Sequence, residues 1–337
     1  MNAFALPIAA MLCASVVAAQ DRGPIIDMHL HASALSEWNV SPPVGICAPF
    51  EHYRVRDPAK PYAAWFEEFY LKGPPCAEPV WSPTTDEEVM RQTLEIMRRR
   101  NIYGVLSDAP DRVASWHAAA PDRFYRGFKF ILGVENHVSP DSLRRLVGRG
   151  AVEVFGEISN AYDGIAPDDP RMAPYWALAE ELDIPVAIHV GASPPGEPYA
   201  GYGARARLES PLSVEEVLVR HPRMRVYLMH AGYPMLDDLL AVLAMHPQVH
   251  VDIGSIVFGL PRPEFYRYLE RIVEAGFVHR VMFGSDQVVW PAVIERSIAV
   301  IEEAPFLSEE QRRDILYYNA ARFLRLSPQE IARHHAR

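Results

Sequence analysis

Short runs of β-branched and other apolar residues alternate with amphipathic segments along the chain, and this alternation restricts the fold more than any other feature. Eight runs have strand character: residues 25–31, 102–107, 128–132, 154–158, 185–190, 225–230, 249–253 and 280–284. Strands that are apolar throughout are buried on both faces, and strands that alternate with helices form parallel sheets. Eight strand-helix units therefore predict an α/β fold, a closed (β/α)8 TIM barrel.

The segments between these runs begin with helix start signals. Thr85 and Ser213 each stand three residues before a glutamate, the pattern of a capping box, and Ser139 is followed by a proline. An open, doubly wound sheet is the alternative architecture. No glycine-rich phosphate-binding turn follows the first run, so the usual reason to prefer that sheet is missing.

Length and charge narrow the class of protein. The 337 residues fit two average domains or one large barrel, and 49% of them are hydrophobic, enough for a large core. The formal net charge is −10, and the longest basic run is the three arginines at 98–100. Nucleic-acid binding needs a basic surface, so we expect no nucleic-acid partner.

The first 19 residues read as a targeting segment. They carry no charged side chain, contain an apolar run and end in small residues, as a signal peptide does. Cleavage after Ala19 leaves one domain over residues 20–337, exported to the periplasm or secreted. No later stretch has the roughly 20 apolar residues of a membrane span, so we expect no stable membrane insertion. Cys47 and Cys76 then either pair or stay free.

One long segment lacks the alternation. Residues 32–83 are rich in proline, tryptophan, tyrosine and phenylalanine, and they follow the first expected strand. On a barrel this connection lies at the face where active sites form, and a loop of this length usually has a functional role. We predict a lid-like insertion.

Histidines and carboxylates stand where apolar strands end. His29 and His31 are two residues apart, so their imidazoles point to the same side of the first strand. Later runs close with polar residues: Glu157, His189, His230 and Asp286. Unpaired burial of such groups costs several kcal/mol each, and a shared divalent cation offsets that cost. Nitrogen and oxygen donors without sulfur suit Zn²⁺, with Mn²⁺ also possible.

These positions resemble those of a known family. The His29-x-His31 pair and the single residues His189, His230 and Asp286 look like the amidohydrolase superfamily. Five further stretches are similar to its amidohydrolase-2 branch: 156–158 (GEI), 183–189 (DIPVAIH), 229–232 (MHAG), 283–286 (FGSD) and 319–324 (NAARFL). The resemblance covers the whole chain after the targeting segment.

The resemblance implies a TIM barrel with a metal at the carboxyl ends of its strands. His29, His31, His189 and Asp286 would hold the principal ion. His230 would bind a second ion or assist catalysis beside a single one. Glu157 stands where many relatives place a carboxylated lysine, so the number of ions stays open. Lys129 does not match that bridging position and is expected to be structural, and relatives often form homodimers.

The expected reaction is hydrolysis of a small amide, ester or lactone. A metal lowers the pKa of bound water to about 7, Asp286 acts as general base, and His230 polarises the scissile carbonyl or orients the nucleophile. The alternative is a metal-dependent, non-oxidative decarboxylase of an aromatic or unsaturated acid. A third reading is a non-catalytic metal- or ligand-binding barrel.

Four residues are candidates for substrate contact. Arg205 and Arg207 follow the fifth expected strand, where an arginine fork suits a substrate carboxylate. Tyr233 and Trp290 stand three and four residues beyond His230 and Asp286. The histidines nearer the C-terminus, including His334, are expected on the surface.

Overall fold

The fold is a barrel of eight parallel strands. The computed structural model describes residues 23–38, 40–68, 74, 76–134 and 136–336, so the predicted signal peptide lies outside the described residues. The strands follow one another around the sheet in chain order. They are β1 (Ile25–His31), β4 (Ile102–Ser107), β5 (Phe124–Phe130), β6 (Val154–Ile158), β7 (Val186–Ile188), β8 (Val226–Leu228), β9 (His250–Asp252) and β10 (Val281–Met282).

A backbone hydrogen bond brings the first and last strands together. The Met28 N–H donates to the Phe283 carbonyl at 2.9 Å, directly after β10 ends. The barrel is thus nearly closed, and the predicted TIM barrel is confirmed. The third strand begins at Phe124, before the expected residue 128, because residues 124–126 pair in parallel with residues 104–106 of β4.

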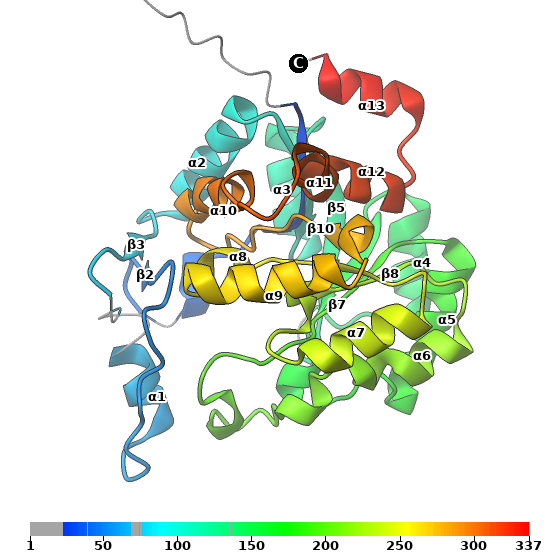
Figure 1. Cartoon of the computed structure of the whole chain (residues 1–337). Coiled ribbons are helices and arrows are strands. Elements are labelled where there is room, and N and C mark those ends of the chain that lie inside the picture. Colours follow the sequence, from blue (N-terminus) through cyan, green and yellow to red (C-terminus); the bar gives the residue numbers. More distant parts are fainter. Residues whose placement is uncertain (1–22, 39, 69–73, 75, 135, 337) are drawn as a thin grey trace, which may run out of the picture.

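Helices fill the connections between the strands (Figure 1). They are α2 (Asp86–Arg99), α3 (Pro110–Ala119), α4 (Pro140–Gly148), α5 (Ala173–Leu182), α6 (Glu215–Arg220), α7 (Leu236–Met245), α8 (Ile256–Gly259), α9 (Arg262–Glu274) and α10 (Ala292–Glu302). Thr85 and Ser139 cap α2 and α4 as expected. Ser213 caps nothing, because a 3-10 turn capped by Ser210 leads into α6. No helix in the described ranges is long and apolar enough to cross a membrane.

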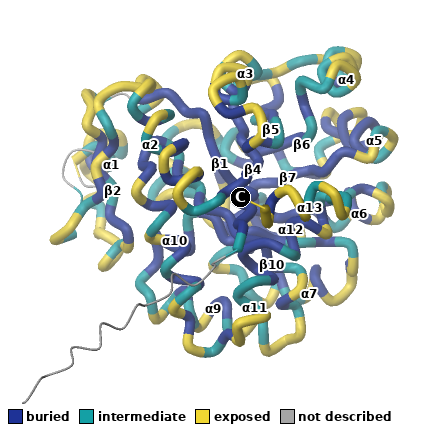
Figure 2. The backbone as a smooth tube through the Cα atoms, turned by 90° about the horizontal axis from the view of Figure 1, so that it is seen from above, coloured by how far each residue is buried: buried dark blue, intermediate teal, exposed yellow. Residues whose placement is uncertain are grey.

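The amino end of the barrel is closed by the C-terminal part of the chain. This part comprises α11 (Glu309–Arg313), a π-helical turn (Asp314–Tyr318), α12 (Asn319–Phe323) and α13 (Pro328–His335). In Figure 2, α12 and α13 lie over the middle of the strands. His334 is only 6% exposed and stacks on Tyr103 at 3.5 Å, so its expected surface position is wrong. Its Nδ1 lies 3.0 Å from the Tyr317 hydroxyl, so the ring is both stacked and hydrogen-bonded.

The segment between β1 and α2 lies at the opposite end of the barrel from α13 (Figure 1). It holds a 3-10 turn (Leu35–Trp38), the antiparallel pair β2 (Gly45–Ile46) and β3 (Val80–Trp81), and α1 (Tyr62–Phe66). Cys47 and Cys76 form a disulfide with a Cα–Cα distance of 5.8 Å. The Phe50 N–H donates to the Gly259 carbonyl at 2.8 Å. These bonds fix the segment to itself and to the barrel.

Candidate metal centre

The six polar residues expected at the strand ends come together in space. His31 Nε2 lies 3.1 Å from Asp286 Oδ1 and 3.6 Å from Glu157 Oε2. His29 Nε2 lies 3.5 Å from the same Asp286 oxygen. The ends of β1, β6 and the chain after β10 therefore meet at one point inside the barrel mouth.

Glu157 connects this group to the two remaining histidines. Its Oε1 lies 2.8 Å from His189 Nδ1, and that nitrogen lies 3.0 Å from His230 Nε2. The His230 ring in turn lies 5.1 Å from the His29 ring. The cluster is therefore continuous across five strand ends.

Two irregularities in the strands aim these side chains inward. The β1–β4 register shifts between Asp27 and Leu30, and the β5–β6 register shifts opposite Phe128. Ile26 and Val154 face the barrel interior before the shifts, whereas Leu30 packs in the outer core after one of them. Bulges change which residues of a strand face inward, and they are common beside active sites. Here they turn His31 and Glu157 into the barrel.

The backbone is strained where the later strands end. His230, Ala231, Ser255, Asp286 and Val288 all have positive φ values, between 44° and 59°. A non-glycine residue in this region costs about 1–3 kcal/mol, and such residues gather at functional sites. The positive φ values at His230 and Asp286 turn the chain sharply where their strands end, and both side chains lie in the cluster.

The donor set fits a divalent cation. Three overlapping groups each have their ligand atoms within 4.8 Å of one another: His29, His230 and Asp286; His29, His31 and Glu157; Glu157, His189 and His230. An ion bound at about 2.0–2.2 Å brings its ligands within about 4.4 Å of one another, so only a small contraction is needed. The buried atoms His29 Nε2 and His189 Nε2 have no hydrogen-bond partner among the described residues. Unsatisfied buried nitrogens of this kind are what an ion would satisfy.

Mutual electrostatics hold the carboxylates ionised. Burial favours the neutral form of Asp286, but His29 and His31 outweigh it and keep the pKa of this carboxyl well below its usual range. Burial would raise the pKa of Glu157, but a hydrogen bond from His189 outweighs burial and lowers this pKa. Burial would lower the pKa of His29, yet Asp286 and Asp252 raise it to about 10. The cluster thus holds positive charge between two carboxylates, which is the charge an ion would supply.

Two residues beside the cluster were missed by sequence reasoning. Asp252 ends β9, fully buried, and its Oδ2 lies 3.2 Å from His29 Nδ1. It ends an expected strand exactly as the predicted ligands do, so the same rule would have found it. Tyr162 places its ring 4.6 Å from the His189 ring. No pattern in the sequence distinguishes this tyrosine.

Three of the four predicted substrate residues make contacts with residues outside the cluster. Arg205 and Arg207 are exposed, and Arg205 donates to the carbonyl of Ala204 at 2.6 Å. The Tyr233 hydroxyl lies 3.4 Å from Glu264 Oε1. Trp290 is 3% exposed and donates its indole N–H to the Val44 carbonyl at 2.9 Å. The indole therefore fastens the segment after β1 to the barrel.

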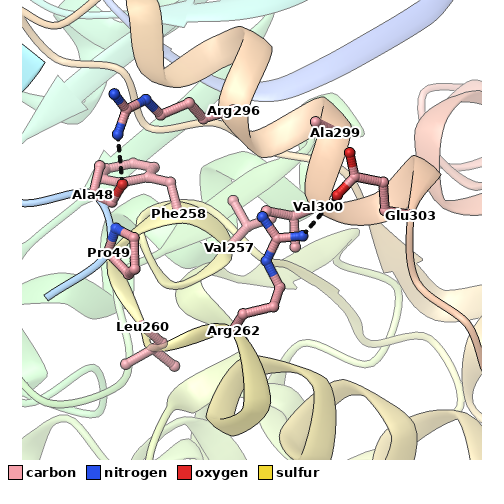
Figure 3. Close-up of a pocket in the computed structure, with 10 residues that line it drawn as sticks. All are labelled: Ala48, Pro49, Val257, Phe258, Leu260, Arg262, Arg296, Ala299, Val300 and Glu303. Atoms are coloured by element: carbon pink, nitrogen blue, oxygen red, sulfur yellow. Dashed lines mark hydrogen bonds and ion pairs between the residues drawn. The ribbon is translucent and has the colours of Figure 1, made fainter. Parts of the chain in front are cut away.

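A cavity of about 240 Å³ lies on the flank of the barrel and not at the cluster (Figure 3). The segment after β1, α8 and α10 enclose it. Arg296 crosses one side to the Ala48 carbonyl at 2.7 Å, and Arg262 pairs with Glu303 at 3.3 Å on the other. None of the six clustered residues lines this cavity. The cavity therefore lies between the barrel and the segment after β1.

Comparison with known proteins places these features in a family. A family model described as Amidohydrolase matches residues 26–326. Gamma-resorcylate decarboxylase from Rhodococcus jostii (strain RHA1) is 27% identical over 267 residues, which are 68% of this chain and 79% of that protein.

Solved structures share the fold. An uncharacterised TIM-barrel protein from Bordetella bronchiseptica superposes with a TM-score of 0.62 at 16% identity, covering 92% of this chain and 99% of that one. A probable 2-pyrone-4,6-dicarboxylic acid hydrolase from Acinetobacter baumannii gives a TM-score of 0.55 at 14% identity, covering 90% of this chain and 99% of that one. At these identities the likeness concerns the fold alone.

Proposed function

The chain belongs to the amidohydrolase superfamily and is an enzyme, and we propose that it is a metal-dependent hydrolase of a small amide, ester or lactone. The observation that carries the metal dependence is the convergence of four histidines and two carboxylates in three overlapping ligand groups. This set exceeds the four ligands of a structural zinc site, and it is held where a TIM barrel places its active site.

The donors select the ion. Imidazole nitrogens and carboxylate oxygens suit Zn²⁺ best among common ions, and Mn²⁺ is the second choice. The family resemblance assigns His29, His31, His189 and Asp286 to one ion, with Glu157 and His230 completing a second position. In the structure His189 groups with Glu157 and His230 and not with His29, His31 or Asp286, so it would have to move to share that ion. Bound there, a divalent cation supplies a Lewis acid that lowers the pKa of water from 15.7 to about 7.

Asp286 is the proposed general base. Its carboxylate is 13% exposed, so one side of it reaches the space that a substrate enters. His29 and His31 keep it ionised, which leaves it able to accept a proton from the attacking water and pass it to the leaving group.

His230 is better suited to binding an ion or accepting a proton than to polarising a carbonyl. Its Nδ1 lies 2.9 Å from the Gly254 carbonyl, which only accepts, so Nδ1 carries the hydrogen. Burial and then the neighbouring His189 lower the pKa of His230, which keeps the ring neutral. Its Nε2 therefore presents a lone pair to the cluster.

Non-oxidative decarboxylation of an aromatic or unsaturated acid is the second candidate. The observation in its favour is the similarity to gamma-resorcylate decarboxylase. In that reaction the carboxylate carbon leaves as CO₂ and its bonding electron pair takes up a proton at the substrate carbon. Asp286 or His230 would first take up a proton from water and then deliver it to that carbon. The same residues thus serve both reactions, and the substrate distinguishes them.

One assay separates the two candidates. The zinc-loaded enzyme is incubated in H₂¹⁸O with a panel of lactones, esters and amides and a panel of hydroxybenzoic acids. Hydrolysis predicts ¹⁸O in a ring-opened or cleaved product without CO₂ release. Release of CO₂ from a hydroxybenzoic acid would replace the hydrolytic proposal by the second candidate.

We further propose export, and with it loss of residues 1–19. The Cys47–Cys76 disulfide supports this, because disulfides persist in oxidising compartments. The periplasmic protein is expected to begin at Gln20, which N-terminal sequencing measures. A small-molecule substrate, with Arg205 and Arg207 as proposed partners of its carboxylate, and a homodimer complete the proposal. Analytical ultracentrifugation tests the dimer.

A further inference from the structure

Asp252 is a buried carboxylate that the proposed reaction does not use. It lies at the end of β9 with no exposed surface. Its Oδ1 accepts the backbone N–H of His230 at 3.1 Å and that of Gly254 at 2.8 Å. Its Oδ2 faces His29 Nδ1 at 3.2 Å. A buried carboxylate without such partners would be strongly unfavourable, so these three contacts define its role.

The Oδ2 contact determines which nitrogen of His29 can bind a metal. Asp252 Oδ2 and His29 Nδ1 lie 3.2 Å apart but are not aligned as a hydrogen bond. A carboxylate oxygen only accepts, so this contact is favourable when His29 Nδ1 carries a hydrogen. When the ring gives up its second proton to bind a metal, Nε2 holds the lone pair, and this is the atom that lies 3.5 Å from Asp286 inside the cluster. A metal-binding histidine commonly donates the hydrogen of its second ring nitrogen to a carboxylate, and this partner fixes the orientation of the ring.

The Oδ1 contacts act on His230 through the backbone. His230 has a φ of 56°, a strained conformation, and its N–H is held by Asp252. Gly254, held by the same oxygen, supplies the carbonyl that accepts the His230 Nδ1 hydrogen. One carboxylate thus sets the tautomer of His29 directly and supports the group that sets the tautomer of His230.

Two glycines allow the backbone to approach the His29 ring closely. A Cβ at Gly254 would lie 2.6 Å from His29 Nδ1, and one at Gly284 would lie 2.9 Å from His29 Cβ. Both glycines let the ends of β9 and β10 approach the His29 ring. The ring is therefore confined between these backbones with its Nδ1 toward Asp252.

We propose that Asp252 is a positioning residue that makes His29 and His230 both present Nε2 to the metal. This inference rests on the proposed metal site. It assigns the end of β9 a task in a cluster whose other members come from β1, β6, β7, β8 and the chain after β10.

The test is zinc affinity in Asp252→Asn, measured by chelator competition. Asparagine retains one oxygen, which continues to accept the two backbone N–H groups, so its NH₂ faces His29 Nδ1. Donor then meets donor, and the hydrogen of His29 moves to Nε2, which removes a ligand atom. We expect zinc affinity to fall by about 10- to 100-fold, with the Co²⁺-loaded protein showing a changed visible spectrum.

Asp314→Asn is the matched control. Asp314 is also a buried aspartate beside a histidine, with Oδ2 3.1 Å from His279 Nδ1, but it lies away from the cluster. We expect this variant to keep wild-type zinc affinity. Equal affinity in Asp252→Asn and wild type, or an equal loss in both variants, would overturn the positioning role.

A measurement on the unaltered enzyme covers the case in which Asp252→Asn does not fold. Two-bond ¹H–¹⁵N spectra of the zinc-loaded protein report which nitrogen of each histidine carries hydrogen. We expect Nδ1–H for His29 and His230, and Nε2–H in His29 would overturn the inference. If the wild-type protein binds no zinc at all, the proposed function fails as well; if it binds zinc with the wrong tautomer, only the positioning role fails.

Discussion

The two ends of the barrel use the same eight strands in opposite ways. At the amino end, Tyr103 and Tyr227 fill the interior and pack against Tyr317 and Phe323 from the C-terminal part of the chain. At the carboxyl end, four histidines and two carboxylates occupy the interior, and several residues hold strained backbone conformations.

The difference separates stability from chemistry. Apolar burial at the amino end contributes free energy of folding, whereas the polar cluster and its strain cost free energy that only a bound ion returns. Changes at the carboxyl end should therefore abolish activity with little loss of fold. Changes at the amino end should do the reverse. Each prediction below tests this separation.

Removal of metal should have the largest effect. Dialysis against a chelator is expected to abolish turnover, because no described side chain replaces the ion as Lewis acid. Far-ultraviolet circular dichroism should stay unchanged, and zinc should restore the activity. Unfolding of the whole barrel on chelation would break the comparison, since the carboxyl end would then carry the fold.

Replacement of the proposed base should rank second. Asp286→Asn removes the proton acceptor while keeping the shape of the side chain, and we expect kcat at saturating zinc to fall by about 10²- to 10⁴-fold. The melting temperature should change little. A variant that folds, binds zinc and turns over at the wild-type rate would remove Asp286 from the mechanism.

Truncation at the amino end should lower stability instead. Phe323 is buried and its ring lies 5.5 Å from the Tyr227 ring. Phe323→Ala is expected to reduce the free energy of unfolding by about 3–5 kcal/mol, because it leaves a cavity. Urea denaturation measures this loss. Zinc affinity and kcat of the folded fraction should match wild type, and a large drop in either would show that the two ends are coupled.

Acid should weaken the amino end through two histidines. Burial lowers the pKa of His334 and of His250 to about 4, against about 6.5 in an unfolded chain. The unfolded state therefore binds more protons between these values, so stability falls as pH drops from about 6.5 to about 4.

His334→Gln sharpens this test. Glutamine does not titrate, so the decrease in unfolding free energy over this pH window should shrink by about 1–3 kcal/mol. Urea denaturation at a series of pH values measures the change. An unchanged slope would mean that His334 does not resist protonation in the folded protein.

The barrel can be predicted from the sequence because hydrophobic periodicity and the number of strands are local properties. The six clustered residues can also be predicted from the sequence, since each stands at or just after the end of an apolar strand, where a buried polar group is costly without a partner. The sequence does not reveal the bulges at β1 and β6, which depend on how neighbouring strands pair. Which of the six residues bind the same ion also depends on strand pairing, so the sequence does not reveal it.

Other features lay beyond local patterns. The buried position of His334 depends on Tyr103, more than 200 residues away in the chain. Asp252 ends an expected strand, so it is accessible to the same rule as the six clustered residues, but its contact with His29 joins two strands far apart in the chain. Trp290 was expected at the substrate, and its N–H instead meets Val44 in a distant segment.

X-ray absorption at the zinc edge of the zinc-loaded enzyme tests the central claim most directly. The account predicts a first shell of nitrogen and oxygen atoms at about 2.0–2.2 Å, with the outer-shell signals of several imidazoles. The imidazole signals should weaken in His189→Ala. A first shell of water without imidazole, or no bound zinc, would contradict it.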